Sequence, residues 1–258
     1  MPEGDTVYRT AKNLRAAIEG AQLTRCDIRV PKFATVDLTG QRVDEVASRG
    51  KHLLMRIGEH TIHTHLKMEG SWHLYRHGSK WRRPAHSARI VLETADWVAV
   101  GYSLGIVEVV PRSEEHTVVG YLGPDLLGPD WDASEALSRL TADPTRAVGL
   151  ALLDQSVLAG LGNVYRNELC FLRGILPTRP VGSVPQPERL IALAHSLIGA
   201  NKDRVERTTT GTLRGATDWV YGRRGQPCRR CGTRILEGRL GVNELQLRET
   251  FWCPSCQS

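Results

Sequence analysis

The 258-residue sequence contains no apolar run approaching the ~20 residues needed to cross a bilayer, which argues against any membrane contact. Its start, Met1-Pro2-Glu3-Gly4-Asp5, is acidic and lacks the apolar segment of a signal peptide. It also lacks internal repeats and low-complexity tracts. With 41% hydrophobic and 24% charged residues, the chain is expected to be a globular cytoplasmic protein of one large or two modest domains.

The charge of the chain is unevenly distributed. The formal net charge is +6 and the pI is about 9.1. The segment 201–258 alone holds 11 Lys/Arg against 6 Asp/Glu. A basic segment suits a polyanion such as nucleic acid, although charge alone is equally compatible with a solvated basic face.

Six cysteines occur, and four of them form two C-x-x-C pairs, Cys228/Cys231 and Cys253/Cys256. Two such pairs suit tetrahedral zinc, because each pair spans one tight turn and the two turns can face each other. Two disulfides or a redox pair are the alternatives, and a cytoplasmic chain without a redox-type βαβ context disfavours both. Cys26 and Cys170 are isolated, and we expect them to be buried apolar residues.

The first half of the chain reads as one helix followed by short strands. Asp5–Ala17 has helical spacing, with Asp5 or Thr6 as its cap. Eight strands with turn signals between them suggest a β-sandwich or barrel, namely Leu23–Val30, Arg42–Ala47, His52–Ile57, Thr61–Leu66, Trp72–Tyr75, Ala88–Leu92, Trp97–Gly101 and Ile106–Val110. The basic stretch Arg76–Pro84 is expected to be an exposed loop.

The second half is predicted to be helical and to end in a hairpin. Leu122–Trp131, rich in Gly, Pro and Asp, reads as a linker between domains. Four helices follow in the prediction: Ala133–Thr141, Thr145–Leu158, Val164–Leu172 and Pro187–Asn201. Apolar residues between the two cysteine pairs can form a β-hairpin.

The residues Pro2 and Glu3 form a candidate nucleophile and its acid–base partner. Removal of Met1 leaves Pro2 as a secondary α-amine, and such an amine titrates near ~8, so part of it is unprotonated at neutral pH. A neutral amine can attack a sugar carbon and form an iminium, while Glu3 serves as general acid or base. Many chains begin Met-Pro-Glu without consequence, so this pattern needs support from the rest of the sequence.

A second pattern lies in Asp154–Tyr165, where Gly160-Leu161-Gly162-Asn163 joins two helical stretches. Glycines allow close approach of a backbone, and the N–H groups that begin the second helix can hold a phosphate. An ordinary helical hairpin is the alternative.

Four motifs in order make a specific resemblance. They are Met1-Pro2-Glu3-Gly4, Ser48–Leu54, Asp154–Tyr165 and Arg248–Gln257. Together they resemble the bacterial formamidopyrimidine-DNA glycosylase / endonuclease VIII family over the whole chain, and most closely its endonuclease VIII branch in the second form found in actinobacteria.

The resemblance implies roles for single residues. Pro2 is similar to the family's nucleophile on C1′ of the damaged nucleotide, and Glu3 to the residue that assists protonation and sugar opening. Lys51, expected in a strand, resembles the lysine that contacts phosphates beside the lesion. Asn163 resembles the phosphate clamp of the helix–two-turn–helix module, and Arg248 the zinc-hairpin arginine that holds phosphates flanking the flipped nucleotide.

Such enzymes extrude the target nucleotide and fill the gap with a wedge. Leu66–Gly70 occupies the place of the family's wedge loop, with Met68 as the candidate wedge and Lys67 beside it. A methionine packed in the β core is the alternative for Met68.

The sequence departs from the family pattern at four places. Gly101–Ile106 replaces the Asp-x-Arg-x-Phe-Gly segment of purine-specific members, which favours oxidised pyrimidines. Thr6 occupies the position of a glutamate that is common in the family. Gly149 occupies the position of a lysine that binds phosphate in purine-type members. The 21-residue interval between Cys231 and Cys253 is longer than usual.

The implied architecture is α+β. A helix and β-sandwich domain (1–117) precedes a linker (118–132), a helix–two-turn–helix domain (133–220) and a zinc β-hairpin (221–258). The implied protein is a monomer that binds damaged DNA, duplex or also single-stranded or bubble DNA, and needs only one structural Zn²⁺. Its reaction would be excision of an oxidised base through a Pro2 iminium, followed by β- and δ-elimination.

Three alternatives remain at this point. One keeps the fold and assigns 8-oxoguanine or formamidopyrimidine as substrate. Another is a non-catalytic module that recognises damaged DNA, which the joint presence of Pro2, Glu3 and Lys51 disfavours. The most distant is a purely structural zinc protein.

Overall fold

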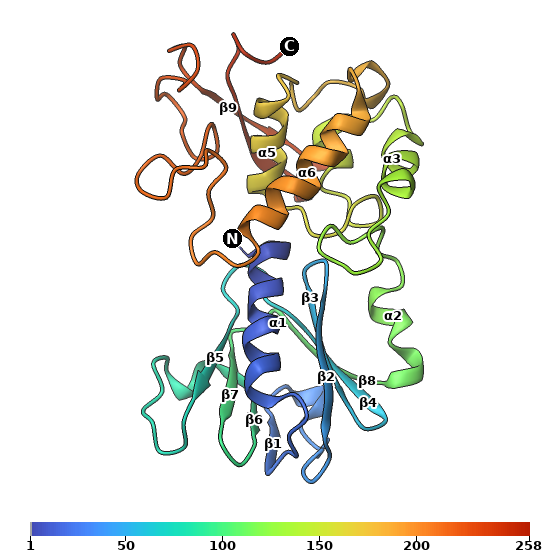
Figure 1. The fold of residues 1–258 in the computed structure, drawn as a ribbon, viewed down its shortest axis with the longest axis vertical. Helices are drawn as coiled ribbons and strands as arrows, with labels where there is room; N and C mark the ends of the chain where they lie inside the picture. The colour runs from blue at the N-terminus through green and yellow to red at the C-terminus, as the bar shows by residue number, and fades with distance from the viewer. Residues whose placement is uncertain (1) are drawn as a thin grey trace. The chain divides into compact units, whose positions relative to one another are not determined.

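The computed structural model describes residues 2–258, and contacts within it divide the chain into two compact units (Figure 1). The first unit ends at Tyr121 and the second begins at Leu122. This boundary falls inside the segment 118–132 that the sequence predicts as a linker. Leu126 is fully buried in the core of the second unit, so the later part of the segment folds with that unit. The limits of the linker and the division at 220/221 stay predictions.

The first unit begins with α1 (Gly4–Ile18), which confirms the predicted helix. A buried stripe at helical spacing runs along it through Val7, Ala11, Leu14 and Ile18. The capping prediction is wrong. Glu3 is the N-cap residue and makes no side-chain cap bond, whereas Asp5 lies inside the first turn and accepts from the backbone N–H of Thr6 at 2.7 Å.

Two four-stranded antiparallel sheets follow, and all eight predicted strands are present with ends shifted by a few residues. The first sheet has the order β1 (Arg25–Ile28), β6 (Ala88–Glu93), β7 (Val98–Tyr102) and β5 (Ser71–Tyr75). The second has the order β2 (Val43–Arg49), β3 (His52–Ile57), β4 (His60–His65) and β8 (Ile106–Pro111). The short helix α2 (His116–Val119) comes after β8.

One apolar core joins α1 to both sheets. Leu53, Met55 and Ile62 of the second sheet share it with Ile90 and Leu92 of the first. The predicted β-sandwich therefore has its core between the sheets. Since side chains alternate along a strand, the residues between these apolar ones on β3 and β4 point to the other face.

The second unit packs α3 (Ala133–Thr141), α5 (Asn163–Leu172) and α6 (Pro187–Asn201) around another core. All three agree with the predicted helices within one residue. The predicted helix Thr145–Leu158 is wrong, because only α4 (Val148–Ala151) forms there. Asp154 Oδ1 accepts from the backbone N–H and the hydroxyl of Ser156, at 2.9 and 2.6 Å, and these local bonds favour a turn over a helix.

The second unit ends in a hairpin of β9 (Leu236–Leu240) and β10 (Arg248–Trp252). Phe171, Val220, Ile235 and Phe251 form a small separate core beneath it. No helix of the described residues has the length and apolarity that crossing a bilayer demands. Cys170 is buried as predicted, whereas Cys26 is only partly buried against the sandwich core.

Candidate functional site

Pro2 and Glu3 directly precede α1. Glu3 has no exposed surface and Pro2 is half-buried. The carbonyl oxygen of Glu3 accepts the backbone N–H of Val7 at 3.1 Å, so the pair is fixed to the first turn of a rigid helix. The predicted removal of Met1 concerns a residue outside the described part of the chain.

Lys51 lies in the turn between β2 and β3, and its predicted place within a strand is wrong. Arg49 and His52 pair across the hairpin and leave Gly50 and Lys51 as the two turn residues. Gly50 has φ of 57°, the left-handed conformation that the first position of a type II′ turn requires. The turn therefore presents Lys51 at the end of the hairpin.

Lys67 and Met68 lie in the loop that follows β4. The backbone N–H of Lys67 donates to His65 Nδ1 at 2.9 Å, and Lys67 has φ of 52°. Met68 is 62% exposed, so the alternative of a methionine packed in the core is wrong. The backbone N–H of Gly70 donates to Leu66 O at 2.9 Å and closes the loop. Met68 is thus an exposed apolar side chain on a tightly closed loop.

Sequence reasoning missed a histidine cluster on the second sheet. The ring nitrogens His52 Nδ1 and His63 Nε2 lie 2.7 Å apart, and His63 Nδ1 lies 2.9 Å from Glu108 Oε2. The hydroxyl of Tyr121 lies 3.1 Å from His52 Nε2. His65 packs edge-on against His52, with 5.0 Å between ring centroids. The alternation His63-x-His65 in a predicted strand was the signal that could have indicated this cluster.

The cluster holds its imidazoles neutral. Burial, reinforced by His63, His65 and two lysines, lowers the pKa of His52 to about 3. Burial and the charges of Lys67 and Lys51 lower the pKa of His65 to about 4. Burial also lowers the pKa of His63. Lys51 and Lys67 are therefore both near enough to the cluster to act on it electrostatically.

In the second unit, α5 is tied to strand β10. Asn163 is buried at the start of α5, and its Nδ2 donates to Glu249 O at 2.9 Å. Arg166 Nη2 donates to the same carbonyl oxygen at 2.8 Å. The backbone N–H of Phe251 donates to Asn167 Oδ1 at 2.7 Å. One of the two N–H groups of the Asn163 amide is thus engaged within the unit.

Arg248 is the first residue of β10, is exposed, and pairs with Leu240 of β9. The connection between the strands contains a short 3₁₀ turn, Glu244–Gln246. Asn243 Oδ1 accepts the backbone N–H groups of Leu245 and Gln246 at 3.0 and 3.1 Å and orders this turn. The hairpin and its tip therefore occupy most of the interval between Cys231 and Cys253.

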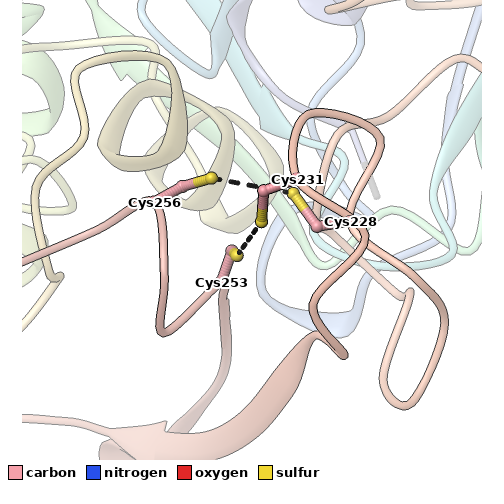
Figure 2. A group of neighbouring side chains, drawn as sticks. All are labelled: Cys228, Cys231, Cys253 and Cys256. Atoms are coloured by element: carbon pink, nitrogen blue, oxygen red, sulfur yellow. Dashed lines mark hydrogen bonds between the residues drawn. The ribbon is translucent and has the colours of Figure 1, made fainter.

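The four cysteines of the two C-x-x-C pairs converge from two turns (Figure 2). Their sulfur atoms all lie within 4.8 Å of one another. Cys231 Sγ is 3.4 Å from Cys253 Sγ, and Cys228 Sγ is 3.9 Å from Cys256 Sγ. The backbone N–H of Arg230 donates to Cys228 Sγ at 3.4 Å. This cluster can hold a metal ion.

The departure at Gly149 has a steric basis in the second unit. A Cβ on Gly149 would lie 2.8 Å from Pro177 O and 3.0 Å from Leu240 Cδ2. The carbonyl of Pro177 is the obstacle that cannot give way as a flexible side chain can. A lysine at this position therefore requires the Pro177 backbone to shift.

These parts, a helix with a β-sandwich, a helical unit and a four-cysteine hairpin, together define one class of DNA repair proteins. The chain belongs to the formamidopyrimidine-DNA glycosylase family. Residues 1–103 match the N-terminal domain of formamidopyrimidine-DNA glycosylase, and residues 122–213 match its H2TH domain. The family and the fold class predicted from the four motifs are thereby confirmed.

Within this family the chain is 56% identical to DNA-(apurinic or apyrimidinic site) lyase Nei2 of Mycolicibacterium smegmatis, over 100% of this chain and 99% of that protein. It is 52% identical to Endonuclease 8 2 of Mycobacterium tuberculosis, with 100% of both covered. The fold matches Lactococcus lactis Fpg in complex with abasic-site DNA, with a TM-score of 0.80, 23% identity and 100% of both chains covered.

Proposed function

We propose that the protein is a bifunctional DNA glycosylase and AP lyase of base excision repair. The observation that carries the proposal is the position of Pro2 and the wholly buried Glu3 at the first turn of α1, in a chain 56% identical to a protein named as an AP lyase. An amine on a rigid helix end needs no further cofactor to attack a sugar carbon.

The reaction we propose begins with attack of the Pro2 nitrogen on C1′ of the damaged nucleotide. The C1′–N bond to the base breaks, Glu3 supplies a proton as the sugar ring opens, and a Pro2 iminium forms. Loss of a proton from C2′ then expels the 3′ phosphate, and a second elimination expels the 5′ phosphate. Attack of water on C1′ of the remaining iminium releases the sugar remnant as an aldehyde and returns the free Pro2 amine.

We propose that DNA is held by residues of both units. Lys51, at the end of its hairpin, would contact phosphates, and the exposed Met68 with Lys67 would enter the gap left by the flipped nucleotide. In the second unit the proposed phosphate ligands are Arg248 and the start of α5 at Asn163. The DNA can be duplex, single-stranded or in a bubble.

The four cysteines are proposed to hold one structural Zn²⁺. Four thiolates in two knuckles are the donor set that zinc prefers, and four protein ligands leave no open position for catalysis. The ion would fix the two cysteine-bearing turns, one before β9 and one after β10, and so hold the two ends of the hairpin together.

Oxidised pyrimidines are the proposed substrates. In the segment Gly101–Ile106, Tyr102 is fully buried and Leu104 is 3% exposed, so neither side chain is available as a second wedge. Excision rates on thymine-glycol and 8-oxoguanine duplexes test the choice, and faster 8-oxoguanine excision would favour a purine-type enzyme. We further propose a monomer acting in the cytoplasm, where bacterial DNA lies.

Covalent trapping tests the mechanism. The protein is incubated with abasic-site or thymine-glycol duplex and borohydride, and the adduct is mapped by mass spectrometry. We expect a reduced adduct on Pro2 that a Pro2→Gly variant loses, while Cys26→Ser retains it. Tight binding without any adduct, with Met1 shown to be removed, would instead favour a non-catalytic damage-binding module. Absence of salt-sensitive DNA binding would favour a structural zinc protein.

A further inference from the structure

The histidine cluster forms a continuous chain of hydrogen bonds across three strands of the second sheet. His63 and Glu108 are direct cross-strand partners on β4 and β8. His52 on β3 pairs with His65, two residues beyond His63, so that all four side chains share one face. That face lies opposite the one that carries Leu53 and Met55 into the sandwich core.

The direction of this chain follows from its carboxylate end. An ionised carboxylate only accepts, so His63 Nδ1–H donates to Glu108 at 2.9 Å. In a neutral His63 the other nitrogen, Nε2, is then an acceptor, and His52 Nδ1–H donates to it at 2.7 Å. His52 Nε2 becomes an acceptor in turn, and it receives the hydroxyl proton of Tyr121 at 3.1 Å.

This arrangement holds His52 at both ring nitrogens. The side chain is 6% exposed, and that of His63 is 2% exposed, so a broken link would leave a buried polar atom without its bond. The charged and titratable groups around the pair are Lys51, Lys67, His65, Glu108, Glu115 and Tyr121. His65 accepts from the Lys67 backbone through Nδ1 and so is itself unprotonated there.

His52 is also the first residue of β3, directly after the turn that carries Lys51. The pairing of Arg49 with His52 closes that turn. A ring fixed at both nitrogens therefore fixes the residue on which the turn ends. The position of the Lys51 backbone depends on this residue and on the left-handed conformation of Gly50.

We propose that Tyr121, His52, His63 and Glu108 form a positioning relay for Lys51, in which both histidines are neutral and carry their proton on Nδ1. The relay fixes the β2–β3 turn so that Lys51 is preorganised for phosphate binding. The purpose of the relay rests on the proposed role of Lys51 in DNA binding, whereas its proton arrangement does not. All four members are positioning residues, because they act through Lys51.

The proton arrangement is tested first, without reference to activity. In protein labelled with ¹⁵N-histidine, the ring-nitrogen shifts of His52 and His63 are recorded at pH 7 and assigned with the variants His52→Gln and His63→Phe. We expect both rings neutral with the proton on Nδ1. A proton on Nε2 of either ring, or a protonated ring, would overturn the relay.

The action on Lys51 is tested with a double-mutant cycle on the Kd for a duplex with a borohydride-reduced abasic site, which the proposed lyase cannot cleave. We expect His63→Phe to raise Kd by about tenfold in the wild-type background and by less than about twofold in a Lys51→Ala background, since coupled residues are not additive. His60→Phe, at the far end of the same strand, is the matched control and should leave Kd unchanged. Equal effects of His63→Phe in both backgrounds would overturn the positioning role while leaving the proposed function intact.

Tyr121→Phe removes a single hydroxyl from a residue that is 55% exposed, and it serves as the second variant if His63→Phe fails to fold. The same non-additivity with Lys51→Ala is expected, and additive effects would contradict the relay. If Lys51→Ala alone leaves Kd unchanged, the proposed role of Lys51 is wrong and the relay has no DNA-binding purpose. That result differs from additivity, so the two failures are distinguishable.

Discussion

Asn163 at the start of α5 donates its side-chain amide to the carbonyl oxygen of Glu249 in β10, at 2.9 Å. The two residues are 86 positions apart in the chain and belong to two of the predicted sequence segments, 133–220 and 221–258. The bond joins the helix that resembles a phosphate clamp to the strand that begins with Arg248. Helix α5 and the β9–β10 hairpin are therefore directly bonded to each other. A substitution in one is expected to shift or destabilise the other.

Loss of this bond is expected to destabilise the second unit. Asn163→Ala should lower the free energy of unfolding by about 1–2 kcal/mol, because the carbonyl oxygen of Glu249 loses one of its two donors. Urea unfolding followed by tryptophan fluorescence measures the change. Asn13→Ala, at an exposed position of α1, should change it by less than about 0.5 kcal/mol. An equal effect of the two substitutions would show that the bond contributes nothing.

Glu168 is expected to be a stronger anchor. Its carboxylate is fully buried and accepts the backbone N–H groups of Trp219, Val220 and Tyr221 at 2.8–2.9 Å, together with the hydroxyl of Thr209. Glu168→Gln places an amide donor among these donors and should cost about 3 kcal/mol or more. Chemical denaturation gives the value, with exposed Glu188→Gln as the matched control. A cost below about 1 kcal/mol would contradict the anchor.

Removal of the metal should unfold the hairpin before the rest of the second unit. Purified protein is expected to contain about one zinc per chain, and Cys253→Ser or a strong chelator should remove most of it. The measurement is metal content by mass spectrometry together with the fluorescence of Trp252, the last residue of β10. Cys26→Ser, outside the cluster, should keep its zinc. A full complement of zinc in Cys253→Ser would exclude the four-thiolate site.

The buried histidines predict a loss of stability on mild acidification. The folded-state pKa of His52, about 3, lies below the ~6.5 of an unfolded histidine, so its contribution is complete above pH ~6.5 and is lost as pH falls toward 3. The slope from this residue alone reaches about 1.4 kcal/mol per pH unit. Unfolding in urea at pH 7, 6 and 5 should show the decline.

Two variants separate this effect from general acid denaturation. His52→Gln should flatten the decline between pH 6.5 and 5, since it cannot be protonated in the unfolded state. His77→Gln replaces a histidine whose side chain is 44% exposed and should leave the decline as it is in the wild type. The same decline in both variants would assign it to other groups.

The sandwich could be predicted closely because its short strands are separated by turn signals, as at Gly58 between β3 and β4. The prediction of a helix at Thr145–Leu158 was wrong because it used only the spacing of apolar residues. That spacing carries no information on the hydrogen bonds between Asp154 and Ser156, which favour a turn. Lys51 was assigned to a strand because the left-handed φ of Gly50 is a property of the folded hairpin.

The histidine cluster was beyond reach for another reason. His52 and His63 belong to different strands, and the cluster is completed by Glu108 and Tyr121, which are distant in sequence. Only the register of β3, β4 and β8 brings these residues together. The cysteines, by contrast, occur in two C-x-x-C pairs, a spacing typical of tetrahedral zinc sites. Their convergence could therefore be predicted from the sequence.

The hairpin between Cys231 and Cys253 also bears on how such a chain can change over time. Its two ends are fixed by the sulfur cluster and by the bonds from α5, whereas the Asn243-ordered tip makes its own turn. Doubling the length of a surface loop costs only about 0.6 kcal/mol of closure entropy. Residues can therefore be gained or lost at the tip with little penalty, and the cysteine cluster need not move when the tip changes length.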